Sequence, residues 1–180
     1  MRRRRIAGLI VLALLVSLVW WGISSIASLF TPAKPIAEGD QPITECASGV
    51  VSVTALVGDG EMRISQFDAT TKPELWFTLT NNGKVDCKFN AGPKVQFYTI
   101  KIGEETIWTN EQCDRIDLKD QVVTLSPGVE TKSVPSPWLR VYSSNEGCGE
   151  GQPIALPGKY LFEVKVNGVQ STNLEQFSLD

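Results

Sequence analysis

The segment from Leu156 to Val166, LPGKYLFEVKV, decides the fold class. Its apolar residues Tyr160, Phe162, Val164 and Val166 recur at every second position, which is the period of a β-strand with one buried face. The Pro-Gly pair before the strand is turn chemistry, because proline fixes φ and glycine accepts the left-handed region. The segment therefore predicts a turn followed by a half-buried strand, with the tyrosine hydroxyl bent back onto the backbone of the corner.

The same alternation recurs along the chain, interrupted by turn signals. In Glu74 to Asn81 (ELWFTLTN), Leu75, Phe77 and Leu79 lie on one side, and the Asn82-Gly83 pair that follows suits a tight hairpin. Further strands are expected at Val50–Val57, Lys94–Ile102, Ile107–Trp108, Val122–Leu125, Val129–Ser133, Trp138–Tyr142 (after the edge prolines Pro135 and Pro137) and before Leu179. Seven to nine short strands with no helical period predict an all-β fold, an antiparallel β-sandwich.

The N-terminus carries a membrane signal. Arg2–Arg5 are followed by 25 uncharged residues, Ile6–Phe30. About 20 apolar residues suffice for a helix to cross a bilayer, and Trp20 and Trp21 suit its outer interface. The arginines resist translocation, so we expect a single-pass plasma-membrane protein whose N-terminus is cytoplasmic and whose C-terminal domain is extracellular.

This prediction divides the chain into a basic tail (1–5), a transmembrane helix (6–30), a proline-containing linker (31–44) and one outer domain (45–180). The alternative is a cleaved secretory signal, for which Ser25 and Ala27 supply small residues at a cleavage site. Because the apolar run exceeds the roughly 7–15 residues usual in such signals, we favour the uncleaved anchor.

Four cysteines, Cys46, Cys87, Cys113 and Cys148, all follow the anchor. An even number in an exported domain indicates two disulfides, and the absence of histidine and of CxxC pairs from the sequence argues against zinc. Three pairings are possible, and the sequence alone does not separate them. We favour Cys46–Cys87 with Cys113–Cys148, since the first would tie the incoming chain to an early hairpin.

The charge distribution bears on partners. All twenty acidic residues follow Phe30, together with thirteen of the seventeen basic ones, so this part carries a net charge of −7. Nucleic-acid binding needs clustered lysine and arginine, and we therefore expect no nucleic-acid partner.

Catalytic motifs are few. Without histidine, a Ser-His-Asp or Cys-His arrangement is impossible, and no phosphate- or dinucleotide-binding glycine motif occurs in the sequence. A Ser-Lys dyad around Lys132 is the remaining nucleophile, with Ser126, Ser133 or Ser136. We therefore expect no enzymatic activity and no cofactor.

Two groups of side chains are candidate binding residues. Asp114, Asp117 and Asp120 recur at every third position and are weak calcium candidates, although calcium needs six to eight oxygen ligands and a solvated acidic loop is the simpler interpretation. Trp76, Trp108 and Trp138 are candidates for an exposed aromatic binding patch. The alternative is that these tryptophans are structural, and we favour it.

The succession of IWTNEQC (Ile107–Cys113), Pro127-Gly128, Trp138, and Pro157-Gly158 before Tyr160 resembles immunoglobulin-like domains of bacterial exported proteins. It is similar to membrane-anchored, uncharacterised proteins of actinobacteria, and distantly to the bacterial intracellular proteinase inhibitors. The resemblance implies an Ig-like sandwich. It leaves two expectations for function: a non-catalytic cell-surface interaction or assembly module that binds a protein or an envelope component, or an inhibitor or regulator of an extracellular hydrolase.

Overall fold

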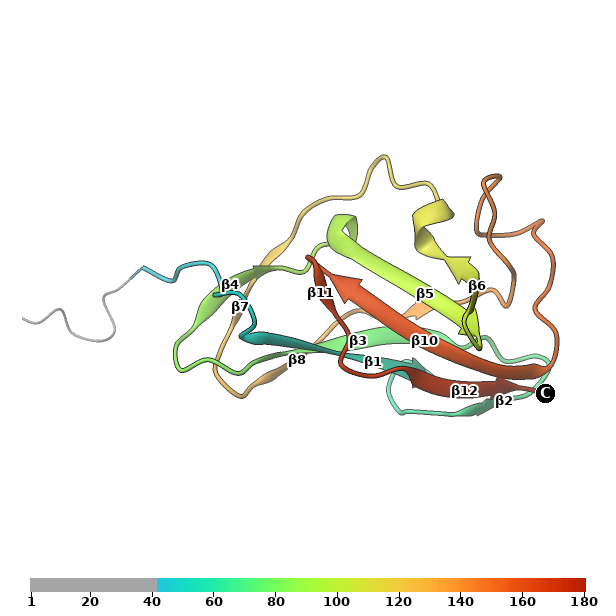
Figure 1. Cartoon of the computed structure of the whole chain (residues 1–180), viewed down its shortest axis with the longest axis horizontal. Helices are drawn as coiled ribbons and strands as arrows, with labels where there is room; N and C mark the ends of the chain where they lie inside the picture. The colour runs from blue at the N-terminus through green and yellow to red at the C-terminus, as the bar shows by residue number, and fades with distance from the viewer. Residues whose placement is uncertain (1–41) are drawn as a thin grey trace, which may run out of the picture. The chain divides into compact units, whose positions relative to one another are not determined.

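Short strands are the main regular elements of the described chain, residues 42–180 of the computed structural model (Figure 1). The strands are β1 (Val51–Gly58), β2 (Gln66–Phe67), β3 (Glu74–Asn81), β4 (Cys87–Asn90), β5 (Gln96–Ile102), β6 (Glu105–Thr109), β7 (Val122–Leu125), β8 (Glu130–Lys132), β9 (Ser136–Pro137), β10 (Gly158–Val166), β11 (Val169–Gln170) and β12 (Glu175–Leu179). Two 3-10 turns, η2 (Pro93–Val95) and η3 (Asn110–Gln112), flank β5 and β6, and these residues contain no α-helix. The all-β prediction is therefore confirmed for this part of the chain.

The strands form two main sheets and a small one. The first sheet has the order β1-β3-β8, with β9 also paired to β3, and the second has the order β2-β12-β10-β5-β6, with β11 paired to β10. β4 and β7 form a separate pair. All pairings are antiparallel except β12 with β2. The inner faces of the two main sheets enclose one core, which is the arrangement of a β-sandwich.

The period-two patterns place the core side chains. Ala55 of β1 lies opposite Phe77 of β3, and both are at most 1% exposed. At one end of the core, Trp138 packs edge-on against Tyr160 and Phe177, with ring centroids 5.5 and 5.9 Å away. The Tyr160 hydroxyl donates to the carbonyl of Leu156, so the predicted tyrosine corner is confirmed.

Three local predictions are wrong. Asn82-Gly83 is not a two-residue hairpin, because the Asn81 side chain accepts from Gly83 N at 2.8 Å and donates to Val85 O at 2.9 Å, which organises a longer loop. Lys94 lies in η2 rather than at the start of a strand. No strand covers Trp138–Tyr142: the left-handed φ of Arg140 (58°) interrupts it, and the paired residues are the preceding Ser136–Pro137.

The predicted anchor Ile6–Phe30 and the linker up to residue 41 lie outside the described residues. Within residues 42–180, no helix has the length and apolar character needed to cross a membrane.

Candidate functional site

A cleft of about 700 Å³ lies between the two sheets along one open side of the sandwich. The inner wall of the cleft is the segment Thr131–Pro137, which contains the end of β8 and β9. The outer wall is the segment Cys113–Gln121 with the start of β5. Both walls are edge segments, so the cleft forms where the sandwich is not closed by further paired strands.

The floor of the cleft is aromatic. Phe77 and Tyr98 meet edge to face with ring centroids 6.2 Å apart, and Trp108 lines the same space. The Tyr98 side chain is buried, and this burial raises the pKa of its phenol to about 12. Its hydroxyl donates to Gln96 Oε1 at 3.3 Å. The floor is therefore neutral and apolar, with a hydroxyl and an amide as its polar groups.

Arg115 holds the outer wall to the body of the domain. Its guanidinium donates to the carbonyls of Pro93, Lys94 and Gln96 at 2.9 to 3.2 Å and lies 4.8 Å from the centre of the Phe97 ring. Partial burial lowers the pKa of Arg115. The carbonyls and the ring engage this cation, so it positions the wall and is not offered to a ligand.

Close backbone packing fixes the other end of this wall. Ala91 N donates to Gln121 O at 2.8 Å, and a Cβ on Gly92 would lie 2.3 Å from Gln121 N. Only glycine fits this approach, because any side chain would push residues 119–121 away.

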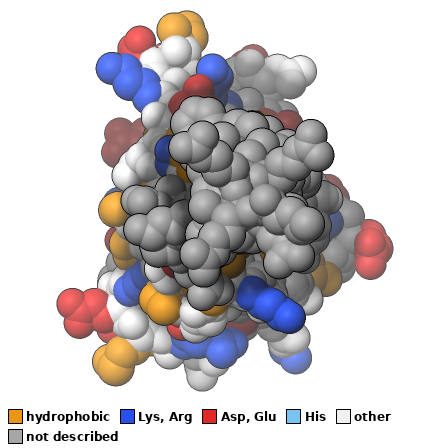
Figure 2. Space-filling view, turned by 90° about the vertical axis from the view of Figure 1, so that its left-hand side faces the viewer, with side chains coloured by type: hydrophobic (Ala, Val, Ile, Leu, Met, Phe, Trp, Pro, Cys, Tyr) orange, Lys and Arg blue, Asp and Glu red, His pale blue; other side chains and the backbone are white. Residues whose placement is uncertain are grey.

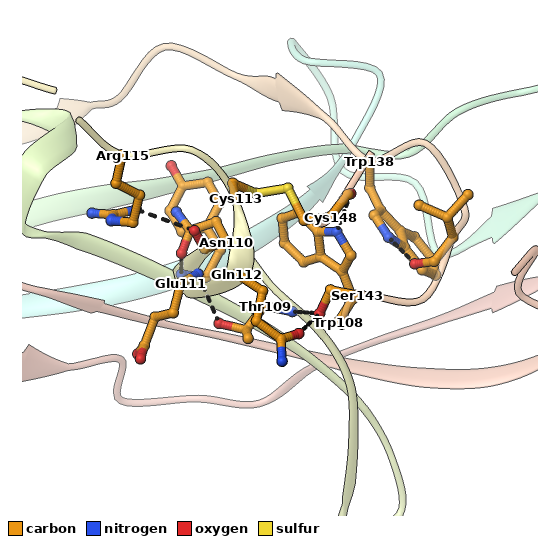
Figure 3. Close-up of a disulfide and its surroundings, with 12 residues drawn as sticks. Trp108, Thr109, Asn110, Glu111, Gln112, Cys113, Arg115, Trp138, Ser143 and Cys148 are labelled. Atoms are coloured by element: carbon orange, nitrogen blue, oxygen red, sulfur yellow. Dashed lines mark hydrogen bonds between the residues drawn. A yellow bond between two sulfur atoms is a disulfide. The ribbon is translucent and has the colours of Figure 1, made fainter. Parts of the chain in front are cut away.

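The disulfide Cys113–Cys148 joins this wall to the loop 143–152 (Figure 3). Trp108 lies beside the disulfide, and its indole N–H donates to Cys148 O at 2.9 Å. The Ser143 hydroxyl accepts from Thr109 N at 2.9 Å, a second tie between β6 and the same loop. With Cys46–Cys87, this bridge gives the pairing that we favoured, so that prediction is confirmed.

The inner wall contributes a serine hydroxyl to the cleft, whereas the ammonium group of Lys132 lies away from it. Ser133 Oγ accepts from Phe77 N at 3.0 Å on the cleft side. Lys132 Nζ lies 5.0 Å from the Trp76 ring and donates to Gly60 O. Since successive strand residues point to opposite faces, Lys132 and Ser133 do not form the Ser-Lys dyad considered above.

The aromatic-patch hypothesis is wrong, because Trp76, Trp108 and Trp138 are all buried, at 2%, 7% and 0% exposure. Trp76 does point away from the core side of β3, as its phase predicts. Lys132 covers it there, and the turn at Gly58 packs against it: a Cβ on Gly58 would lie 2.8 Å from the Trp76 ring. Trp138 is a core residue whose indole N–H donates to Val141 O at 3.1 Å.

The structure does not gather the calcium candidates into one site. Asp114 accepts from Ile116 N at 3.0 Å, and Asp120 accepts from Asn90 Nδ2 at 2.7 Å. The Asn90 hydrogen bond, with help from Lys94, lowers the pKa of Asp120. Over residues 42–180, no group of three or more acidic, cysteine or histidine side chains is arranged to hold a metal ion. Asp114 and Asp120 thus act as local backbone and side-chain acceptors.

Sequence reasoning missed the cleft itself. Phe77 and Tyr98 carry the signal of ordinary core residues, and Thr131 and Ser133 that of an ordinary strand. The one cue was apolar residues in loop positions: Ile116 and Val134, one in each wall, are 89% and 86% exposed. Among the coloured atoms of Figure 2, hydrophobic, basic and acidic side chains are interspersed, and no patch of one kind stands out.

No protein-family model and no curated protein sequence matches the chain. Among solved structures, it is similar to part of an alkylpurine DNA glycosylase of Pseudomonas fluorescens bound to DNA containing an abasic site analog, at 14% identity and a TM-score of 0.40 over 72% of this chain and 30% of that one. It is similar to the sporulation control protein of Bacillus subtilis at 9% identity and a TM-score of 0.39, over 73% of this chain and 50% of that one. A β-glucosidase of Listeria innocua matches at 11% identity and a TM-score of 0.38, over 72% and 16%. The chain spans half or less of each of these proteins.

Proposed function

We propose that the protein is a non-catalytic interaction or assembly module of the cell surface. Ile6–Phe30 anchors it in the plasma membrane with Arg2–Arg5 in the cytoplasm, and an Ig-like sandwich outside binds a protein or an envelope component. This is the arrangement of the membrane-anchored actinobacterial proteins that the sequence resembles.

The cleft between the sheets is the observation that carries the proposal. Its volume of about 700 Å³ lies within the roughly 300–1,000 Å³ usual for binding pockets, its floor is aromatic, and its walls contribute polar side chains. Each wall also carries an exposed apolar side chain, Ile116 or Val134. A cleft of this size with exposed apolar side chains at its walls suits the binding of a partner, and binding needs no catalytic side chain.

The disulfides support the proposed location. All four cysteines are paired, and such bonds persist in oxidising compartments outside the cytoplasm. Both follow the apolar run in the sequence, as an outer domain requires.

Site-specific photocrosslinking in intact cells tests the proposal. The full-length protein carries a photoreactive residue at Val134, beside the cleft, or at Leu174, an exposed aliphatic side chain (54%) that does not line it. We expect a discrete crosslinked product from position 134 and none from position 174. The same products from both positions, or none from either, would reject the proposal, and inhibition of a secreted hydrolase by the purified protein would favour the inhibitor alternative instead.

A further inference from the structure

We propose that Asn167 is a site of spontaneous covalent modification, at which the side-chain amide is lost and the residue becomes a mixture of aspartate and isoaspartate. The reaction is favoured where glycine follows the asparagine, because a residue without a Cβ leaves its backbone N–H unhindered. The sequence has two such pairs, Asn82-Gly83 and Asn167-Gly168. The geometry leaves the second pair free to react and holds the first in place.

The reaction needs water as its only co-reactant. The amide nitrogen of Gly168 loses its proton to hydroxide and attacks Asn167 Cγ. The new C–N bond closes a cyclic succinimide, and the side-chain nitrogen takes up a proton from water and leaves as ammonia. Water then opens the ring. Cleavage between Gly168 N and Cγ gives aspartate, whereas cleavage between Gly168 N and the main-chain carbonyl carbon gives isoaspartate, whose backbone runs through Cγ.

Asn167 and Gly168 form the tip of the hairpin between β10 and β11. Val166 pairs with Val169, so these two residues alone make the turn, and both have a positive φ, 47° and 82°. Both are exposed, and a Cβ on Gly168 would meet nothing within 4 Å. Among the described residues, neither the Asn167 side chain nor Gly168 N has a hydrogen-bond partner. The bond that holds this residue runs from Asn167 N to Val95 O at 2.9 Å and involves neither reacting atom.

Hydrogen bonds hold the other pair at both reacting groups. Gly83 N, the attacking atom, donates to Asn81 Oδ1 at 2.8 Å, and Asn81 is itself fully buried. Asn82 Nδ2, the leaving group, donates to Val50 O at 3.2 Å and to Ser52 Oγ at 3.1 Å. These bonds must break before Gly83 N approaches Asn82 Cγ, so the folded structure slows the reaction there.

The segment that follows β11 gives the modification a structural consequence, because it covers the outer edge of β1. Thr172 N donates to Val53 O at 2.8 Å. The Asn173 side chain accepts from Ala55 N at 2.9 Å and donates to Ala55 O at 3.0 Å. These bonds take the place of a neighbouring strand, and the turn at Asn167 positions the chain that makes them.

The two products differ in backbone length. Aspartate keeps the backbone and adds a negative charge at the exposed tip of the hairpin. Isoaspartate adds a methylene to a turn whose length fixes the pairing of Val166 with Val169. We therefore expect isoaspartate to loosen β11 and residues 171–173, and aspartate to leave them unchanged.

Incubation of the purified full-length protein at mildly alkaline pH tests the inference, with Asn82 as an internal control. Peptide mapping by mass spectrometry follows both pairs in the same sample. We expect Asn167 to react at least about tenfold faster than Asn82 in the folded protein, and the two to react at similar rates in urea, where the hydrogen bonds are absent. Equal rates in the folded protein, faster reaction at Asn82, or a difference that persists in urea would overturn the inference.

Hydrogen exchange tests the consequence for the β1 edge. The aged protein, with its isoaspartate content measured by peptide fragmentation, is compared with freshly prepared Asn167→Asp, which carries the charge on a normal backbone. We expect faster exchange of residues 169–173 in the isoaspartate form and unchanged exchange in the variant. Equal exchange in the two proteins would refute the role of backbone length.

Discussion

The two disulfides close loops of similar length and differ in what they hold. Cys46–Cys87 spans 41 residues and Cys113–Cys148 spans 35, with Cα–Cα distances of 4.8 and 4.9 Å. Beside the first bridge, Cys46 N donates to Lys88 O at 2.9 Å and Lys88 N donates to Thr44 O at 2.8 Å. The first bridge thus reinforces a backbone pairing between the incoming chain and β4.

The second bridge joins two loops that side chains connect. The contacts beside it are the Trp108 indole on Cys148 O and the Ser143 hydroxyl on Thr109 N and Gln112. The chain-entropy model assigns both bridges nearly the same stabilisation, roughly 4 kcal/mol, because it counts only loop length. Two bridges that restrict the unfolded chain to a similar extent therefore have different roles in the folded domain. Cys113–Cys148 holds a wall of the cleft.

The largest expected effect comes from removing Cys113–Cys148 with alanine at both positions. We expect the free energy of unfolding to fall by about 4 kcal/mol, together with faster amide exchange in residues 111–121. Urea unfolding measures the first and hydrogen exchange the second. The matched variant, Cys46→Ala with Cys87→Ala, should lose similar stability and keep the exchange of 111–121 unchanged; if this segment loosens equally in both variants, the comparison fails.

The stability of the domain at alkaline pH tests the burial of Tyr98 in the floor of the cleft. Burial raises the pKa of Tyr98 from 10.0 to about 12, so the unfolded chain releases this proton at lower pH than the folded one. The stabilisation is complete below pH 10 and is lost as pH rises through 12, for a total of about 3 kcal/mol. Burial also raises the pKa of Tyr160, which adds to the effect. Urea unfolding of Tyr98→Phe between pH 9 and 12 should show a flatter dependence than wild type, and an identical slope would contradict the raised pKa.

Gly92→Ala loosens the outer wall at the end far from the disulfide. The new Cβ would meet the backbone at Gln121 N and Lys119 O, at 2.3 and 2.5 Å, and we expect a loss of about 2 kcal/mol. Gly149→Ala is the control, since its Cβ would meet nothing within 4 Å. Thermal unfolding of the two variants provides the measurement, and equal melting temperatures would show that residues 119–121 move aside at no cost.

The smallest effect is expected from Trp108→Phe. It leaves the carbonyl of Cys148 without its donor while it keeps an aromatic ring beside the disulfide, so we expect a loss of about 1–2 kcal/mol. Hydrogen exchange should increase in residues 143–152. Trp138→Phe removes an indole bond to Val141 O instead and should leave that loop unchanged; faster exchange there in both variants would remove the special role of Trp108.

The core was predictable from sequence because its signal is local. Tyr160, Phe162, Val164 and Val166 alternate within one strand and are all buried, and the tyrosine corner lies within five residues of chain. Asn82-Gly83 misled because a distant contact, Asn81 Nδ2 on Leu125 O, shaped that loop together with local ones. The direction of Trp76 followed from strand phase, but its burial depends on Lys132 and on the turn at Gly58.

The sequence by itself determined most of the longer β-strands, the turn before Tyr160 and a paired set of cysteines, since period-two alternation and turn chemistry act over a few neighbouring residues. Only the tertiary structure decided which face of each tryptophan is covered, where the aspartates lie and that a cleft exists at all. Its walls come from β8 and from residues 113–121, and their separation depends on Arg115, Gly92 and Cys113–Cys148, contacts between segments that no local pattern relates.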